Sequence, residues 1–226
     1  MRISLNPVIA NRIDAAVDDL CSAFSGEFER GQIAELMDDS VNQFVDSAVV
    51  LDFLPSLAYR LTRERLNAIR RSAGEVAKGS WDVVFVSLSG GGRGQIAAAL
   101  TTLLSDGQVA VHSAGTAIRG EVDPGVQAVI AELGVDPDDA FAHPVTDEVL
   151  QAADVIVTMG HSVGVVDIPA HVRHQDWRVG DPVGAPVEEI RRVRSDIDRR
   201  VAVLLDELGV AIVGRGETDT LVTERS

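Results

Sequence analysis

The chain has 226 residues, of which 46% are hydrophobic, enough for one large domain or two small ones with apolar cores. Its formal net charge of −15 argues against a nucleic-acid partner, because phosphates would be repelled over most of the surface. The sequence shows neither an apolar run of membrane-spanning length nor the apolar segment of a signal peptide, so we expect a cytoplasmic protein without a membrane partner.

The first part of the chain, residues 1–79, shows only helical spacing. Apolar residues three and four positions apart predict three amphipathic helices, at about 7–25, 32–51 and 62–78. We expect Leu54-Pro55 to interrupt the helical pattern and Gly79-Ser80 to form a hinge. The three helices predict an all-α three-helix bundle domain. Because a core of this size is near the lower limit for independent folding, we expect it to pack against a second copy, as a homodimer, or against the rest of its own chain.

The third predicted helix is rich in arginine: it contains Arg60, Arg63, Arg65, Arg70 and Arg71. A solvated helix face is one explanation for such a run. Docking against the following part of the chain is another, since carboxylates there outnumber basic residues by about two to one. The sequence leaves both explanations open.

Residues 80–214 alternate between strand and helix patterns, which predicts an α/β domain with a parallel sheet and helices on both faces. Four strands are expected, at about 83–86, 109–112, 155–159 and 172–177. Helices are expected at about 95–104, 124–133, 146–153 and 187–208, with Asp123 as the cap of the second. The last residues, 215–226, form a polar tail that we expect to be disordered.

A glycine-rich loop connects the first predicted strand, Val83–Val86, to the helix that follows. Glycines let the backbone turn successive N–H groups inward, and the helix N-terminus adds its positive dipole end. Arg93 supplies a planar guanidinium that can bind two oxygens of one anion. The loop has neither the Gly-Lys-Ser/Thr of a nucleotide-binding P-loop nor a complete dinucleotide fingerprint. We predict that it binds a phosphate-like oxyanion through Ser89, Gly90, Gly91, Gly92, Arg93 and Gly94.

This loop resembles the Cys-x5-Arg loop of the low-molecular-weight protein tyrosine phosphatases and of the arsenate reductases built on the same fold. Ser87 stands where the family has its nucleophilic cysteine, and Arg93 matches the family's arginine. Further similar stretches follow in the same order, at Val111–Thr116, Ala153–Gly160 and Asp176–Pro182. The resemblance implies a fold with a four-stranded parallel sheet, a catalytic set of Ser87, Arg93 and Asp181, with Asp181 as general acid, and no cofactor. Some members are similar also in having an N-terminal helical bundle.

The departures from the family pattern concern its reactive groups and the loop asparagine that braces family members, which is replaced within Ser89–Gly92. A serine hydroxyl is a far weaker acid than a thiol, and serine nucleophiles rely on an adjacent general base. Gly94 replaces the family's serine or threonine after the arginine, and His161 stands where the thioredoxin-coupled arsenate reductases have a second cysteine. The one cysteine of the chain, Cys21, lies in the first predicted helix and is interpreted as a small buried hydrophobic residue. We therefore expect a catalytically impaired oxyanion-binding protein, a pseudoenzyme.

Two alternatives stay open. The first is an active tyrosine phosphatase or arsenate reductase that is represented here by a Cys-to-Ser variant. The second is a regulatory or interaction module with a vestigial pocket. We expect no metal site, because the histidines are scattered along the chain, at His112, His143, His171 and His174 among others.

Overall fold

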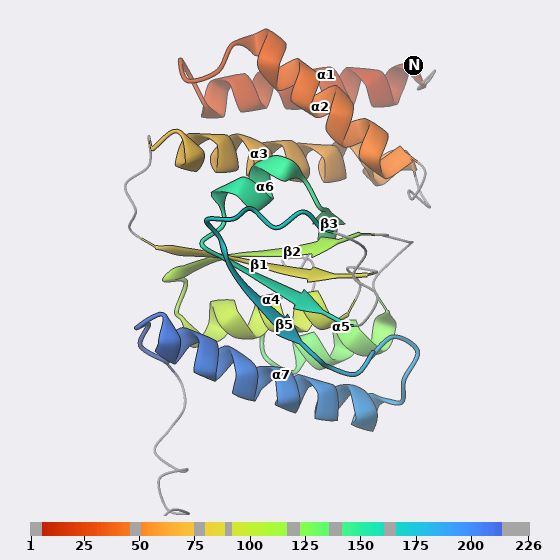
Figure 1. Cartoon of the computed structure of the whole chain (residues 1–226). Coiled ribbons are helices and arrows are strands. Elements are labelled where there is room, and N and C mark those ends of the chain that lie inside the picture. The colour runs from red at the N-terminus through yellow and green to blue at the C-terminus, as the bar shows by residue number, and fades with distance from the viewer. Residues whose placement is uncertain are drawn as a thin grey trace, which may run out of the picture.

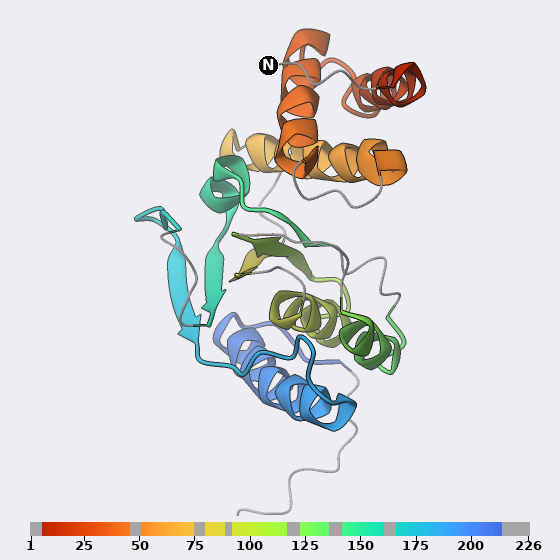
Figure 2. The ribbon, with the colours of Figure 1, turned by 90° about the vertical axis from the view of Figure 1, so that its right-hand side faces the viewer.

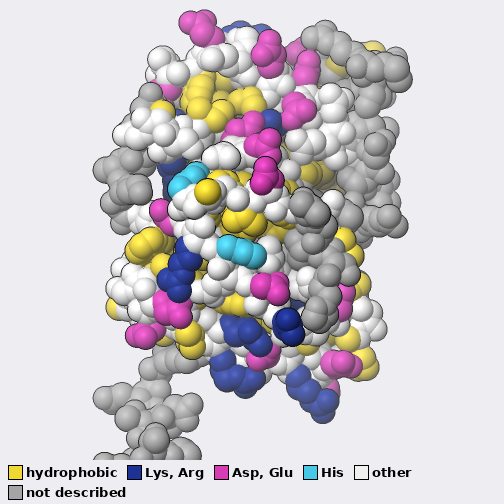
Figure 3. Space-filling model, in the orientation of Figure 1, with side chains coloured by type: hydrophobic (Ala, Val, Ile, Leu, Met, Phe, Trp, Pro, Cys, Tyr) yellow, Lys and Arg dark blue, Asp and Glu magenta, His cyan; other side chains and the backbone are white. Residues whose placement is uncertain are grey.

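The computed structural model describes residues 6–45, 51–74, 80–88, 92–116, 123–135, 142–160 and 166–213. A parallel β-sheet lies between two sets of helices, and the N-terminal helices form the outermost layers on one side (Figures 1 and 2). Acidic side chains gather over α1 and α2, whereas arginine side chains lie among acidic ones over α7 at the opposite end (Figure 3).

The N-terminal helices are α1 (Pro7–Ala23), α2 (Arg30–Val45) and α3 (Leu54–Ser72), with a 3₁₀ turn at Leu51–Phe53. They share an apolar core. Cys21 packs against this core as a small hydrophobic residue, but it is half-buried rather than buried as expected. The expected start of the third helix near residue 62 is wrong. Leu54 begins α3 and Pro55 lies in its first turn, because proline lacks only an N–H that has no helical partner at that position.

The sheet has five strands rather than the expected four. They are β1 (Trp81–Ser87), β2 (Val109–Gly115), β3 (Ala142–Pro144), β4 (Val155–Met159) and β5 (Arg173–Trp177), all parallel, in the order β3-β2-β1-β4-β5. The additional strand, β3, has three residues and pairs with Ser113–Gly115 of β2. Every residue of β4 is buried, as is typical of a parallel strand with both faces covered.

Different helices cover the two faces of the sheet (Figure 1). On one face lie α4 (Arg93–Leu104), α5 (Pro124–Ala131) and α7 (Val187–Glu207), whose apolar residues share a core with Val83, Phe85 and Val157. On the other face lies the short helix α6 (Asp147–Ala152), and α3 packs against it. Ala68 of α3 belongs to the core of this second face. The N-terminal helices therefore pack against the chain's own sheet layer, one of the two arrangements expected from their small core.

The arginines of α3 divide between the two explanations that the sequence left open. Arg60 and Arg63 are exposed. The side chain of Arg65 is only 8% exposed and lies 2.7 Å from Asp39 of α2 and 2.8 Å from Glu148 of α6. Arg71 pairs with Asp82 of β1. Docking through ion pairs is thus confirmed for Arg65 and Arg71.

Among the described residues, no helix combines the length and the hydropathy needed to cross a membrane.

We expect Arg65→Ala to lower the free energy of unfolding by about 1–3 kcal/mol, measured by urea denaturation at neutral pH. The substitution leaves Glu148, which is 26% exposed, without its partner, whereas the more exposed Asp39 regains water. The exposed Arg63→Ala is the matched control and is expected to change stability by less than about 0.5 kcal/mol. Equal effects of the two substitutions would contradict the role given to Arg65.

The pH dependence of the same pair of proteins gives a second test. Burial raises the pKa of Glu148, but the hydrogen bonds that its carboxylate accepts, first of all from Arg65, and the charge of Arg65 together lower it more, so the folded-state pKa lies below the ordinary value of 4.5. A carboxylate with a lowered pKa stabilises the fold above its unfolded pKa, and this contribution is lost as the pH falls through the folded pKa. The stability difference between wild type and Arg65→Ala should therefore be full at neutral pH and shrink in acid.

Candidate functional site

The loop predicted to bind an oxyanion lies at the carboxyl end of β1. Ser87 is the last residue of this strand and pairs with Gly115 of β2 on one side and Met159 of β4 on the other. Helix α4 begins at Arg93, with Gly92 as its cap residue. The carboxyl edge of a parallel sheet is where such folds place their ligands. Ser89, Gly90 and Gly91 lie outside the described residues, so their amide contacts stay a prediction.

Ser87 is buried at this edge, with 1% of its surface exposed. Within the described part of the chain, no group hydrogen-bonds its hydroxyl. Its carbonyl accepts a hydrogen bond from the N–H of Thr116 at 3.1 Å, which fixes the backbone. Because no histidine or carboxylate among the described residues contacts the hydroxyl, it lacks the general base that serine nucleophiles use.

The space beside Ser87 contains a hydroxyl that the sequence did not point out. A Cβ atom placed on Gly94 would lie 2.7 Å from Oγ of Ser113 and 3.6 Å from Oγ of Ser87. Ser113, from β2, therefore takes the place that a side chain at position 94 would enter. The Ser113 hydroxyl and the amide group of Gln95 are also buried and without hydrogen-bond partners among the described residues. The base of the loop is therefore polar, and the hydroxyls of Ser87 and Ser113 and the amide of Gln95 do not hydrogen-bond one another.

Arg93 contacts two segments that are distant from it in sequence, the end of β4 and the segment after β5. Its side chain is 9% exposed, its Nη1 donates to the carbonyl of Val179 at 3.4 Å, and its Nη2 lies 3.5 Å from Oδ2 of Asp181. A Cβ atom on Gly160, which has φ of +95°, would lie 2.5 Å from Nη1. Gly160 directly follows β4, so its lack of a side chain is what lets the guanidinium lie against the end of this strand.

Asp181 lies on the segment between β5 and α7, and its side chain is 57% exposed. Its Oδ1 accepts a hydrogen bond from the N–H of Val183 at 3.3 Å. This segment rests on the loop, because a Cβ atom on Gly92 would lie 2.8 Å from Cγ of Pro182. The structure thus brings Arg93 and Asp181 together at the edge where Ser87 ends β1, and it leaves the Asp181 carboxylate open to solvent.

Asp123 connects this segment to α5. As expected, it caps the helix, because its Oδ1 accepts hydrogen bonds from the N–H groups of Gly125 and Val126. Its Oδ2 also accepts from the N–H of Gly184 at 2.9 Å, a contact that the sequence did not suggest. The pKa of Asp123 is lowered, and the hydrogen bond from the Gly184 N–H is the largest cause. Burial acts in the opposite direction, and the two cap bonds from Val126 and Gly125 lower the pKa further. The Asp123 carboxylate therefore fixes the segment just after Asp181 and Pro182.

The description of the histidines as scattered is wrong for two of them. His112 of β2 and His143 of β3 come together on the face of the sheet that α3 covers, and both contact Glu64 of α3. The separation of 48 positions between Glu64 and His112 hides this cluster in the sequence. His171 and His174 lie elsewhere, at the start of β5.

Two family models match the chain. The model of the low molecular weight phosphotyrosine protein phosphatases matches residues 82–212, and that of the protein-tyrosine-phosphatase-like N-terminal domain matches residues 13–70. A putative arsenate reductase of Halobacterium salinarum is 32% identical over 129 residues, which are 54% of this chain and 89% of that protein. An arsenate reductase of Brevibacillus brevis is 34% identical over 93 residues, which are 40% of this chain and 69% of that protein.

Solved structures agree with these matches. The thioredoxin-dependent arsenate reductase of Corynebacterium glutamicum is 29% identical, with a TM-score of 0.76 over 88% of this chain and 97% of that one. An arsenate reductase in the phosphate binding state is 27% identical, with a TM-score of 0.52 over 56% of this chain and 98% of that one. The chain therefore belongs to the low molecular weight phosphotyrosine protein phosphatase family, which it shares with these arsenate reductases.

Proposed function

We propose that this protein binds a phosphate-type oxyanion, free or on a phosphorylated ligand, at the loop between Ser87 and Gly94, and that it lacks the cysteine chemistry of its family. The observation that carries the proposal is the placement of Arg93. Its permanently charged guanidinium is buried at the N-terminus of α4, against Gly160 and beside Asp181. A buried arginine with long, weak contacts to its neighbours is a site for a stronger anionic partner.

The loop keeps its anion-binding groups although its nucleophile has changed. Backbone amides do not depend on the side chain at position 87, and the N-terminus of α4 contributes its dipole in either case. The buried hydroxyls of Ser87 and Ser113 are neutral donors, whereas a thiolate at position 87 would repel a dianion. The relative whose structure is described as a phosphate binding state supports the choice of ligand.

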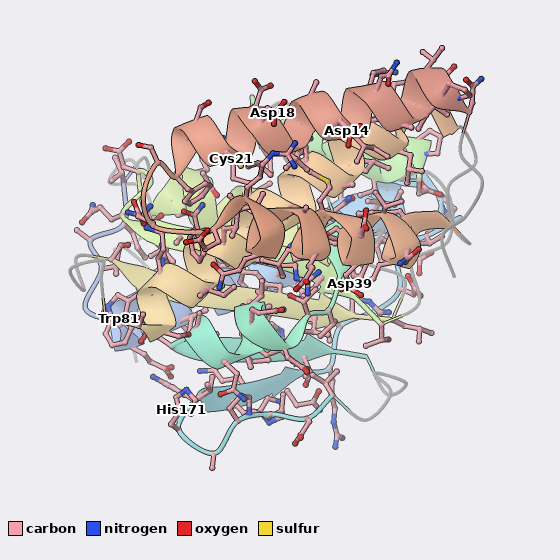
Figure 4. All side chains as sticks on the ribbon, turned by 90° about the horizontal axis from the view of Figure 1, so that it is seen from above. Asp14, Asp18, Cys21, Asp39, Trp81 and His171 are labelled. Atoms are coloured by element: carbon pink, nitrogen blue, oxygen red, sulfur yellow. The ribbon has the colours of Figure 1, made fainter. Side chains whose placement is uncertain are left out.

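Turnover by the family's mechanism needs a thiolate that this chain does not place at the loop. A helix N-terminus can lower a thiol pKa from about 8.5 to below neutrality, but no comparable shift makes a serine alkoxide available. The chain has one cysteine, Cys21, and it lies in α1, in the outer helical layer (Figure 4). A two-electron reduction of arsenate would need several thiols close to the anion. This arrangement favours a binding role over phosphatase or reductase activity.

The homodimer and the cytoplasmic location predicted from the sequence stay predictions. The argument for a dimer was that the three N-terminal helices need a surface to pack against. Helix α3 has such a surface within the same chain, in α6 and the second face of the sheet. Exposed apolar residues on the N-terminal part, Val8 and Phe53, are the groups that a second copy would cover.

We expect phosphate binding, measured by calorimetry, to weaken about 10- to 100-fold in Arg93→Ala, because charge-assisted hydrogen bonds contribute about 1.5–3 kcal/mol. Arg199→Ala is the matched control, since this arginine is 71% exposed on α7, and it should bind like wild type. If wild type does not bind at millimolar phosphate, or if Arg93→Ala binds equally well, the pocket is vestigial and the proposal fails.

Gly160→Ala tests the same site without removing a charge. The added methyl group would lie 2.5 Å from Nη1 of Arg93 and would also strain a residue at φ of +95°. We expect the guanidinium to move and phosphate affinity to fall, by less than in Arg93→Ala. Gly134→Ala, at φ of +76°, with open space around its Cβ position and just beyond α5, controls for backbone strain alone.

Hydrolysis of p-nitrophenyl phosphate tests the impaired chemistry. Wild type should be no faster than buffer, and Ser87→Cys alone should gain little, because position 94 offers no hydroxyl to stabilise a thiolate. Adding Gly94→Ser should raise the rate, most of all with Ser113→Ala, which removes the hydroxyl 2.7 Å from the new Cβ atom. Wild-type turnover that disappears in Ser87→Ala would show instead that the serine is a working nucleophile.

A further inference from the structure

The contact between α3 and the sheet contains two histidines and a glutamate whose ligand atoms all lie within 4.8 Å of one another. Glu64 comes from α3, His112 from β2 and His143 from β3. His143 is almost fully buried, and the side chains of Glu64 and His112 are 17% and 19% exposed. None of these residues belongs to the oxyanion loop.

The proton on His143 can be assigned from its neighbours. Its Nδ1 lies 2.9 Å from the carbonyl oxygen of Pro144, which only accepts hydrogen bonds, so Nδ1 carries the hydrogen. In the neutral imidazole, Nε2 then presents a lone pair. This atom lies 2.7 Å from Oε2 of Glu64, yet it is buried and without a hydrogen bond of acceptable geometry. Two electron-pair donors therefore face each other.

Both ring nitrogens of His112 face carboxylate oxygens, which only accept hydrogen bonds. Its Nδ1 contacts Oε1 of Glu64, and its Nε2 lies 3.3 Å from the carboxylate of Asp82. A neutral ring carries one N–H and can satisfy only one of these acceptors. If Nε2 donates to Asp82, the Nδ1 lone pair points at Glu64. Glu64 is a carboxylate, which is ordinarily an anion at neutral pH, so its oxygens also present only electron pairs.

We propose that Glu64, His112 and His143 bind a divalent first-row transition-metal ion, for which Zn²⁺ is the natural probe. Two imidazole nitrogens and one carboxylate are a common three-ligand set for zinc. Mg²⁺ and Ca²⁺ prefer oxygen ligands only, so a set with two nitrogens does not suit them. Ligand bonds of about 2.0–2.2 Å place ligand atoms about 3.3 Å apart, a spacing that small side-chain rotations reach from the present positions.

The surroundings of the cluster have the features of a metal site. Each histidine offers its second ring nitrogen to an oxygen acceptor, His143 to the Pro144 carbonyl and His112 to Asp82, which is how ligating histidines are normally oriented. A cavity of about 670 Å³ adjoins the cluster and is lined by Tyr59, Arg63, Asn67 and Val149 among others. It leaves room for water or another small ligand at a fourth position.

The site would join two parts of the chain that different family models match. Glu64 lies within residues 13–70, whereas His112 and His143 lie within residues 82–212. A bound metal would therefore connect α3 to two strands of the sheet. Since it binds the folded chain, it should raise the melting temperature. This inference is independent of oxyanion binding at the other site.

The experiment uses the full chain without a histidine tag, stripped with a chelator and then titrated with Zn²⁺ against a chromophoric competitor. We expect one Zn²⁺ per chain, a rise of several degrees in melting temperature, and visible bands of a four- or five-coordinate ion when Co²⁺ replaces Zn²⁺. His112→Gln, His143→Gln and Glu64→Gln should each weaken binding at least about tenfold. His171→Gln, which removes an exposed histidine near β5 (labelled in Figure 4), should bind like wild type.

Circular dichroism in chelator shows whether each variant is folded. Should one variant fail to fold, Glu64→Asp and the wild-type Co²⁺ spectrum still decide the question. If wild type does not bind stoichiometric Zn²⁺, the proposal is overturned. The three side chains are then held together by hydrogen bonds from protonated histidines. Equal binding by the three ligand variants and His171→Gln would also overturn it, because the metal would then sit elsewhere.

Discussion

Helix α3 must be buried on two sides at once, and the arrangement of the whole chain depends on this. Leu54, Leu61 and Leu66 pack into the core of the N-terminal helices, while Ala68 packs into the second face of the sheet. A parallel sheet is stable only when both of its faces are covered, and apart from α3 the second face has only the six-residue helix α6 among the described helices. The polar residues of α3 then specify the docking, because Arg65 and Arg71 reach carboxylates on α6 and β1.

At the oxyanion loop, the backbone and the reactive side chain depend on different physical requirements. Glycine at positions 92, 94 and 160 is needed for space, since a Cβ atom at each would approach Pro182, Ser113 and Arg93 within 3.0 Å. These contacts hold the loop, α4 and the Asp181 segment together irrespective of what stands at position 87. A cysteine, by contrast, is needed for thiolate chemistry alone. Under the proposed function, replacing the cysteine removes the reaction but not the contacts of Gly92, Gly94 and Gly160, so binding and turnover are separable.

The sequence predicted the elements whose signal is local. Val83–Val86 and Val155–Met159 are continuous apolar runs, and Asp123 before Pro124 is a clear cap, so β1, β4 and α5 were expected close to where they lie. Strand β3 has no such signal, because Ala142–Pro144 is too short for alternation and forms only through its register with β2. Pro55 was interpreted as a break because its position within the first turn was not evident. Ser113 and Gly160 matter through contacts with Gly94 and Arg93 that only the folded chain creates.

The same limitation explains why the Glu64, His112 and His143 cluster was not expected, and β2 shows its physical basis. Side chains alternate between the faces of a strand, so consecutive residues of β2 point to opposite sides of the sheet. His112 points to Glu64 on α3, whereas Ser113 points to Gly94 on α4. One peptide unit therefore separates a residue of the cluster from a residue of the oxyanion loop, although the two sites lie on opposite faces. The pairing register of β2 with β1 sets both positions at once, since His112 is opposite Val84 and Ser113 opposite Phe85. A shift of one residue in that register would exchange the two faces and destroy both sites together.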